Sequence, residues 1–233
     1  MSERVVVITG IGRAGQVGEA LALAFARDGA TVAAIDREAS MVEERVRALE
    51  RLGHRARGAV ADLTNPDDTA RAARELVGDA PLHALVNAAG GFAMSGPVAE
   101  SDPTVWHRQI AISLTTAYVA TRAFLPALRR GRGSVVFFAS AAALPAGKVA
   151  EISAYAVAKT GVLTLMRAVS AEEWKNGVRA NAVAPTSIRT AANVASMGVD
   201  QSYVERESVA GAVRWLCSDA ARDVTGQTVR LGA

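Results

Sequence analysis

Short β-branched segments alternate with longer amphipathic segments along the whole sequence. Several of the short segments, including VVVIT, ALVN and SVVFFA, are almost continuously apolar, as is typical of strands buried on both faces of a parallel sheet. Parallel strands need long crossover connections, and the amphipathic segments have the length and pattern of the helices that supply them. The alternation therefore predicts a doubly wound α/β fold, in which a seven-stranded parallel sheet carries helices on both faces.

The predicted elements fill the chain without a linker or an internal repeat, so we expect one domain over residues 1–233. The strand candidates are Arg4–Thr9, Thr31–Asp36, Arg55–Val60, Leu82–Val86, Ser134–Ala139, Val178–Val183 and Thr228–Leu231. The helix candidates are Val17–Asp28, Ser40–Leu52, Pro66–Val77, Pro103–Arg130, Ala154–Asn176 and Glu207–Ser218. Asp102 predicts a helix start at Pro103, and Asn176-Gly177 predicts a helix end. Pro126 predicts a kink or an early end in the helix that contains it.

Charge and hydrophobicity limit the partners that this chain could have. Half of its residues are hydrophobic and its net charge is only +3, which excludes an intrinsically disordered chain. The 26 basic and 23 acidic residues are well mixed, so we expect no nucleic-acid partner. Charges interrupt the apolar runs before the ~20 residues of a membrane span, and no signal-peptide segment opens the chain, so we expect no membrane partner.

The cysteine and histidine residues point to an ordinary reducing environment and to no metal site. Cys217 has no partner for a disulfide within the chain, which favours a cytoplasmic setting, and its amphipathic surroundings predict a core position. His54, His83 and His107 lie far apart in the sequence and show no metal-ligand spacing.

The first predicted strand leads directly into a glycine-rich turn, TGIGRAGQVG, which precedes the first predicted helix. The turn contains Gly10, Gly12, Gly15 and Gly18. Such glycines allow a tight turn and let backbone amides approach a pyrophosphate at the helix N-terminus. Asp36 ends the second predicted strand, where a carboxylate can accept hydrogen bonds from an adenosine ribose and would repel a 2′-phosphate. This pattern favours NAD, while Arg13 and Arg37 leave NADP open because either guanidinium could reach a 2′-phosphate.

Tyr155 and Lys159 are four residues apart in YAVAK, which places both side chains on one face of a predicted helix. A nearby ammonium lowers the pKa of a phenol and makes it usable as an acid or base near neutral pH. Ser140 follows a predicted strand at the carboxyl edge of the sheet, where a hydroxyl could hold a carbonyl or alkoxide oxygen.

With these motifs the chain resembles the short-chain dehydrogenase/reductase family, of the compact single-domain Rossmann-like kind, over nearly its whole length. The resemblance is carried by TGIGRAGQVG, Asp36, Asp62-Leu63, NAAG at Asn87–Gly90, Ser140, YAVAK, NAVAP ending at Pro185, and the closing TGQTVRLGA. It implies that Ser140, Tyr155 and Lys159 form a catalytic triad. Tyr155 would exchange a proton with the substrate oxygen, and Lys159 would also bind the nicotinamide ribose.

The resemblance also implies further cofactor contacts. Asp62 and Leu63 would frame the adenine, and the segment Asn87, Ala88, Ala89 and Gly90 would line the cofactor. Pro185, Thr186, Ile188 and Thr190 would run past the nicotinamide. Phe92, Met94 and Leu144 follow these motifs and are expected to wall an apolar substrate pocket, with Ser187–Tyr203 as its lid.

Four departures from the family pattern stand out. The glycine turn is two residues longer than usual, so Gln16 replaces the middle glycine; we expect a bulge in which amides near Val17 still face phosphate. Ser113 occupies the position of an Asn that anchors a water in the family's proton relay. The segment from Ser140 to Tyr155 is two residues longer than usual. Thr186 replaces a glycine, which narrows the range of backbone φ and ψ angles available beside the nicotinamide.

These features predict an NAD(P)-dependent oxidoreductase that moves a hydride between nicotinamide and a carbonyl or secondary alcohol of a small molecule. The alternative is a cofactor-binding regulator or scaffold with weakened catalysis, motivated by Ser113 and the altered turn. Related enoyl reductases place their Tyr and Lys seven residues apart, and extended epimerases need a substrate domain of about 100 further residues. By family analogy we expect a homo-oligomer, a tetramer or a dimer, packed through helices Pro103–Arg130 and Ala154–Asn176.

Overall fold

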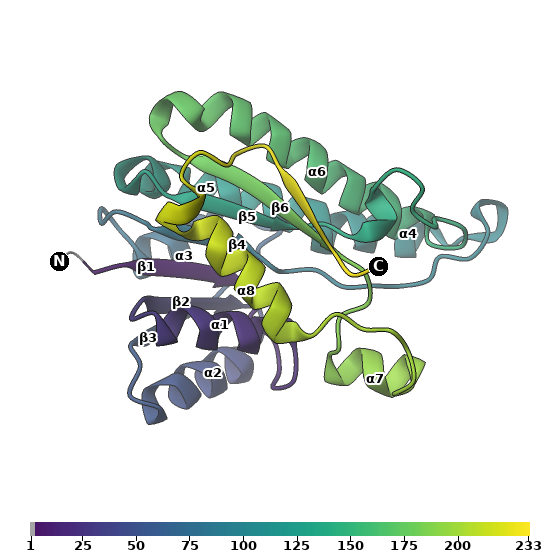
Figure 1. The fold of residues 1–233 in the computed structure, drawn as a ribbon, viewed down its shortest axis with the longest axis horizontal. Helices are drawn as coiled ribbons and strands as arrows, with labels where there is room; N and C mark the ends of the chain where they lie inside the picture. The colour runs from purple at the N-terminus through teal and green to yellow at the C-terminus, as the bar shows by residue number, and fades with distance from the viewer. Residues whose placement is uncertain (1–2) are drawn as a thin grey trace.

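The computed structural model describes residues 3–233, so the first two residues of the predicted domain lie outside it. Seven strands form one parallel sheet in the order β3-β2-β1-β4-β5-β6-β7, which confirms the predicted fold (Figure 1). The strands are β1 (Val5–Thr9), β2 (Thr31–Asp36), β3 (Ala56–Val60), β4 (Ala84–Asn87), β5 (Ser134–Phe138), β6 (Arg179–Pro185) and β7 (Thr228–Leu231). Each predicted strand therefore exists, with ends that differ by at most two residues.

The predicted helices are also present, and the structure adds one more. They are α1 (Val17–Arg27), α2 (Ala39–Arg51), α3 (Pro66–Leu76), α4 (Pro103–Gln109), α5 (Thr116–Gly131), α6 (Ser153–Glu173), α7 (Ala191–Met197) and α8 (Arg206–Cys217). The single predicted helix from Pro103 is α4 and α5 joined by a π-helical segment, η2 (Ile110–Thr115). Short 3₁₀ turns are η1 (Val98–Glu100), η3 (Ala141–Ala143), η4 (Trp174–Asn176) and η5 (Asp219–Ala221). Helix α7 was not predicted and lies within the expected lid.

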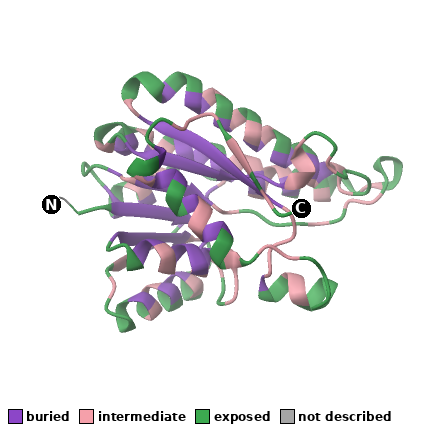
Figure 2. Cartoon of the chain, in the orientation of Figure 1, coloured by how far each residue is buried: buried purple, intermediate pink, exposed green. Residues whose placement is uncertain are grey.

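Two apolar cores, one on each face of the sheet, hold the layers together (Figure 2). Helices α1, α2 and α8 pack over one face, and α3, α5 and α6 pack over the other. Strands β1 and β5 are buried along their whole length, as their continuous apolar pattern predicts. Cys217 lies 2% exposed in the core beneath α8, which confirms its predicted packing position.

The helix boundaries follow the predicted capping signals with one exception. The Asp102 side chain accepts a hydrogen bond from the backbone N–H of Thr104 and begins α4. Gly177 ends η4 in the left-handed conformation, with a φ of 76°. Pro126, however, does not end its helix, because α5 continues to Gly131. Of the two outcomes expected at Pro126, the early end is wrong, since the buried face of α5 outweighs one missing backbone hydrogen bond, and the kink stays a prediction.

One helical stretch among residues 3–233, Pro103–Gly131, is long and apolar enough by length and composition to cross a membrane. A single stretch of this kind is weak evidence, because the core helix of a globular domain meets the same criterion. Here its side chains Phe124 and Leu128 are fully buried in the core against the sheet.

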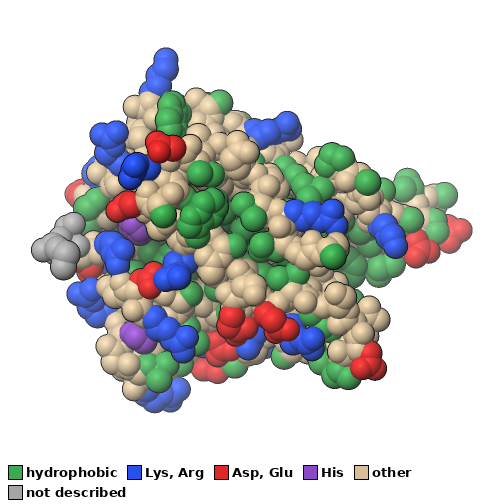
Figure 3. Space-filling model, in the orientation of Figure 1, with side chains coloured by type: hydrophobic (Ala, Val, Ile, Leu, Met, Phe, Trp, Pro, Cys, Tyr) green, Lys and Arg blue, Asp and Glu red, His purple; other side chains and the backbone are tan. Residues whose placement is uncertain are grey.

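The sheet brings the carboxyl ends of all seven strands to one edge, because every neighbouring pair of strands is parallel. Helix α7 and the C-terminus lie at this edge, on the right of the view in Figure 1. On the face shown in Figure 3, basic and acidic side chains are interspersed and do not form a single basic patch. In open α/β sheets, ligands bind outside the carboxyl ends of the strands, so a binding site is expected at this edge.

Candidate active site

The glycine-rich turn, residues 10–16, joins β1 to α1 and packs against the segment that follows β4. Gly10 has a φ of 63°, and a Cβ atom at this position would lie 2.5 Å from the Cα of Ala89. The Ala89 N–H in turn donates to the Thr9 hydroxyl over 3.2 Å. Glycine at position 10 thus lets the backbones of two neighbouring loops touch, and Val17, the first residue of α1, lines the cavity described below.

Asp36 lies at the end of β2, directly beside this turn. Its carboxylate accepts hydrogen bonds from the backbone N–H of Gly12 at 3.1 Å and of Arg37 at 2.8 Å. These bonds fix a negative charge at the position where the adenosine ribose of a dinucleotide would lie. The side chains of Arg13 and Arg37 are exposed, and Arg37 forms a surface ion pair with Glu38.

The enlarged part of the turn is held by Glu19, which was not among the predicted site residues. The N–H of Gly15 donates to the Glu19 carboxylate over 2.8 Å, and Arg45 and Arg206 contact the same carboxylate at 2.9 and 3.2 Å. Burial opposes ionisation of Glu19, but the bonds from Gly15 and the arginines lower its pKa below the ordinary value. Gln16 is the N-cap residue of α1 without a side-chain cap bond, and Val17 and Gly18 begin the helix.

The residues expected to frame the adenine, Asp62 and Leu63, lie in the turn between β3 and α3. Asp62 accepts hydrogen bonds from the N–H and hydroxyl of Thr64, at 2.9 and 2.7 Å, and Leu63 is 6% exposed in the core. Asn87 is buried and donates to the Thr121 hydroxyl over 2.9 Å. Ala88 and Gly90 line the cavity described below.

Ser140, Tyr155 and Lys159 come together at the carboxyl edge of the sheet, where β5 ends and α6 begins. All three line one cavity of about 710 Å³. Lys159 is 6% exposed, and its ammonium donates to the Phe138 carbonyl over 2.7 Å and lies 5.9 Å from the centre of the Tyr155 ring. The Ser140 hydroxyl accepts a hydrogen bond from the N–H of Ala142 over 3.2 Å, which caps η3.

The electrostatics of this group differ from the expectation in one respect. Burial raises the pKa of Tyr155, while a hydrogen bond with Ser140 opposes that shift. Burial also lowers the pKa of Lys159 from 10.5 to about 8. Burial is the larger of these two causes for Tyr155, so its side chain is a neutral phenol near pH 7. A neutral phenol is a proton donor.

Ser113 lies in the π-helical segment η2, which packs against α6, the helix that carries Tyr155 and Lys159. It is 1% exposed, and its hydroxyl has no hydrogen-bond partner within residues 3–233. A Cβ atom on Gly90 would lie 3.4 Å from both the Ser113 hydroxyl and the Lys159 ammonium, so these two groups border the same small space. The π-helical turn thus directs a polar atom toward Lys159, in keeping with the frequent occurrence of such turns at functional sites.

Of the other predicted residues, some line the cavity and others lie outside its lining. Phe92 and Leu144 line the cavity, and the Phe92 ring meets that of Tyr155 edge-to-face, with 5.1 Å between ring centres. Met94 is 55% exposed and does not line the cavity. Pro185, Thr186 and Ile188 line it, while Thr190 caps α7 through the Asn193 N–H. Thr186 is not among the residues with positive φ, so the replacement of glycine costs no backbone strain here.

The predicted lid contains a short helix that reaches back to the glycine turn. The N–H of Ala191, the first residue of α7, donates to the Gly15 carbonyl over 3.0 Å. The Tyr203 hydroxyl donates to the Gly198 carbonyl over 2.7 Å and ties down the far end of the lid. The lengthened turn therefore meets the lid at Gly15, a contact that sequence reasoning missed because it joins loops far apart in the chain.

These observations fit a nicotinamide dinucleotide. The Asp36 carboxylate after β2, the start of α1 after β1 and the cavity containing Lys159 follow one another along one edge of the sheet, in the order that the adenosine ribose, pyrophosphate and nicotinamide of a dinucleotide need. The Ser113 hydroxyl, which has no partner among residues 3–233, lies beside Gly90 of the cavity wall.

Comparisons with known proteins agree with this geometry. A family model described as enoyl-(acyl carrier protein) reductase matches residues 10–231. The chain is 34% identical to 2-(S)-hydroxypropyl-CoM dehydrogenase 3 of Xanthobacter autotrophicus, over 97% of this chain and 94% of the relative. The chain belongs to the short-chain dehydrogenase/reductase family. It is an enzyme of the kind that transfers a hydride between NAD(P) and an alcohol or carbonyl group, and the scaffold alternative is not favoured.

Solved members of the short-chain dehydrogenase/reductase family share the whole fold. A 3-oxoacyl-[acyl-carrier protein] reductase from Brucella melitensis with bound NAD has a TM-score of 0.86 and 29% identity, covering 98% of this chain and 89% of that chain. A structure from Beutenbergia cavernae with bound NADP has a TM-score of 0.88 and 31% identity, covering 99% and 95%. The family thus binds both dinucleotides, and the Tyr155–Lys159 spacing of four residues sets this chain apart from the enoyl reductases discussed above.

Within residues 3–233, no group of three or more His, Cys, Asp or Glu side chains could hold a metal ion. The polar groups in the wall of the cavity include the hydroxyls of Ser140 and Tyr155, the ammonium groups of Lys148 and Lys159, and the Arg230 guanidinium.

Proposed function

We propose that this enzyme reduces a ketone to a secondary alcohol, and oxidises the alcohol in reverse, with Tyr155 as the acid and base. The observation that carries the proposal is the convergence of Ser140, Tyr155 and Lys159 on one cavity. A nicotinamide dinucleotide bound along this edge would supply a hydride to the carbonyl carbon, or accept one from the alcohol carbon in the reverse direction. The Tyr155 phenol gives its proton to the carbonyl oxygen as that oxygen gains charge, so the products are the alcohol and NAD⁺.

The neighbouring side chains support this proton transfer. The Ser140 hydroxyl can donate to the developing alkoxide and hold it beside the phenol. Lys159 keeps a positive charge near neutral pH and favours the phenolate that remains after the transfer. The Ser113 hydroxyl can hold a water that returns a proton toward Lys159, although it reaches less far than an Asn side chain.

Kinetics with a panel of ketones test the proposal. We expect the purified enzyme to oxidise NADH with at least some ketones, and Tyr155→Phe to lower kcat by about 10²- to 10⁴-fold. NADH binding, followed by fluorescence, should be retained in Tyr155→Phe. Turnover that is unchanged in Tyr155→Phe would rule out the proposed role.

We further propose a preference for NAD, held by the residues of the glycine turn, Asp36, Asp62-Leu63, Asn87–Gly90 and Pro185–Thr190. The support is the Asp36 carboxylate, whose fixed negative charge would repel the 2′-phosphate of NADP. Asp36→Ala should therefore lower the ratio of kcat/KM for NADH over NADPH by about tenfold or more. A wild-type enzyme that uses NADPH better than NADH would contradict this proposal.

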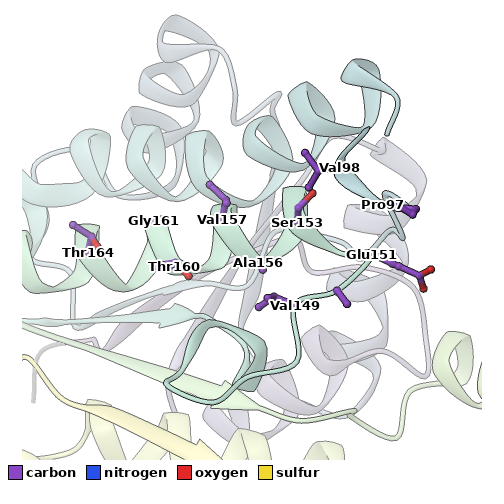
Figure 4. A pocket seen from close by; sticks show the side chains of 11 residues that line it. Pro97, Val98, Val149, Glu151, Ser153, Ala156, Val157, Thr160, Gly161 and Thr164 are labelled. Atoms are coloured by element: carbon purple, nitrogen blue, oxygen red, sulfur yellow. The ribbon is translucent and has the colours of Figure 1, made fainter. Parts of the chain in front are cut away.

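A homo-oligomer, a dimer or tetramer, is the third part of the proposal. An apolar groove of about 1020 Å³ runs along the outer face of α6 and is lined by Val98, Val149, Val157, Gly161 and Thr164 among others (Figure 4). Exposed aliphatic side chains around such a groove favour burial against a second copy of the chain. We also propose that residues 1–233 act as one domain in a cytoplasmic setting, supported by the single sheet and the unpaired Cys217.

A further inference from the structure

The wall of the catalytic cavity carries positive charge that the proposed chemistry does not use. Its charged lining residues are Lys148, Lys159 and Arg230, and no Asp or Glu of residues 3–233 lines it. Lys159 belongs to the catalytic group. Lys148 and Arg230 form no salt bridge with any residue that the structure describes. Two cations at the mouth of an otherwise largely apolar cavity are therefore free to bind a ligand.

Arg230 stands at the substrate side of the cavity and not at the pyrophosphate side. It lies on β7, in register with Ala184 of β6, near the carboxyl edge of the sheet. Three strands separate β7 from β1, where the glycine turn begins. At about 4.8 Å per strand spacing this distance is roughly 19 Å, longer than an arginine side chain. Arg230 therefore does not serve the cofactor pyrophosphate.

The direction of the Arg230 side chain follows from its neighbours. Val229 and Leu231 pack into the core beneath α1 and α8. Because side chains alternate along a strand, Arg230 points to the opposite face of the sheet, where α6 and Tyr155 lie.

Lys148 reaches the same cavity from the long loop between Ser140 and Tyr155. The loop folds back on η3, since a Cβ atom on Gly147 would lie 2.5 Å from the Ala142 carbonyl oxygen. This close packing brings the next residue, Lys148, to the cavity mouth. Glu151 of the same loop lines the groove on the outer face of α6 instead (Figure 4), so it does not line the cavity beside Lys148.

We propose that the substrate carries an anionic group, such as a carboxylate, sulfonate or phosphate, which Lys148 and Arg230 bind while the carbonyl carbon lies at Tyr155. The inference rests on the proposed function and names its substrate class. Phe92, Leu144 and Met197 supply apolar wall, which suits a short hydrocarbon between the two ends. The anionic group is unchanged in the reaction: NADH and a proton convert the keto anion into the hydroxy anion and NAD⁺.

Matched pairs of substrates test this inference. We would measure kcat/KM with NADH for 4-oxopentanoate and its methyl ester, and for the sulfonate and phosphate analogues of the same chain length. The wild type should favour one or more of the anions over the ester by at least about tenfold, mostly through KM. Arg230→Gln and Lys148→Gln should each reduce this preference, and the double variant should abolish it. Lys175→Gln, at an exposed lysine that does not line the cavity, is the control.

Binding gives a second readout that does not need turnover. Calorimetric titration of the enzyme–NADH complex should show tighter binding of an anion than of the ester, with the difference lost in the double variant. If no compound turns over but this preference remains, the proposed function fails and the anion site stands. Equal binding of every anion and the ester to the wild type, or a preference that survives in the double variant, would overturn the inference.

Discussion

Lys159 carries an ammonium group in a buried position. Burial lowers its pKa from 10.5 to about 8, and its one hydrogen bond goes to the Phe138 carbonyl. Between pH 8 and 10.5 the unfolded chain holds this proton and the folded chain does not, so the free energy of unfolding rises with pH in this interval. Below pH 8 the folded protein carries the full cost of a buried charge.

Lys159→Met should remove this pH dependence. From pH 8 to pH 10.5, the unfolding free energy of the wild type relative to Lys159→Met should rise by up to about 3 kcal/mol. Urea unfolding at a series of pH values measures this difference. Lys175→Met, at an exposed lysine, should show no comparable change. A flat difference across this interval would show that the folded-state pKa is not lowered.

The Ser113 hydroxyl is buried and has no hydrogen-bond partner among the described residues. Restoring the longer side chain in Ser113→Asn should raise kcat several-fold and change the pH profile, since a better-held water moves protons more readily. Initial rates from pH 6 to 10 measure both effects. If rates and profile were unaltered, position 113 would not belong to a relay in this enzyme.

At the scale of elements, Glu19 joins three helices around the glycine turn. It belongs to α1, Arg45 belongs to α2, and Arg206 begins α8, while the Gly15 N–H bonds the same carboxylate. Arg45 is 4% exposed, so its charge depends on this partner. Because the pKa of Glu19 is lowered, its stabilising contribution is present above pH 4.5 and is lost as the pH falls through the folded-state value.

Glu19→Gln should lower both stability and cofactor affinity. We expect a loss of about 2 kcal/mol in the free energy of unfolding, because a buried guanidinium loses its counter-charge. The dissociation constant for NADH should rise as the glycine turn loosens. Glu43→Gln, which breaks the exposed pair with Arg47, should change the unfolding free energy by less than about 0.5 kcal/mol. Equal effects of the two substitutions would contradict the structural role of Glu19.

At the scale of the whole molecule, the apolar groove along α6 is the surface that bears on assembly. Val157 lies in this groove and is 46% exposed, although α6 also carries Tyr155 and Lys159 on its inner face. An oligomer that covers the groove would therefore also support the helix that holds the catalytic pair.

Val157→Arg should dissociate the oligomer into smaller species, because a charge in a covered apolar groove has no counter-charge there. Light scattering coupled to size-exclusion chromatography measures the mass in solution. Leu52→Arg introduces the same charge at an exposed leucine at the end of α2 and should leave the mass unchanged. A wild-type enzyme that is monomeric at micromolar concentration would refute the proposed interface.

The sequence alone determined the features that depend on local spacing. Apolar runs predicted each strand of the sheet within two residues, and the cap at Asp102 predicted the start of α4. The glycine turn and the four-residue spacing of Tyr155 and Lys159 predicted the family and its chemistry, since both motifs are contiguous in the chain. Periodicity did not predict α7, which is short and buries no residue of its own.

Only the tertiary structure decided the features that depend on burial or on distant contacts. Lys159 was expected to lower the pKa of Tyr155, whereas in the folded structure burial of the phenol raises that pKa. Glu19 and Arg206 are 187 residues apart, and Lys148 and Arg230 come from a loop and an edge strand, so no local pattern could join either pair. A sequence pattern reports which residues are near along the chain, whereas desolvation and charge pairing depend on which residues the fold brings together.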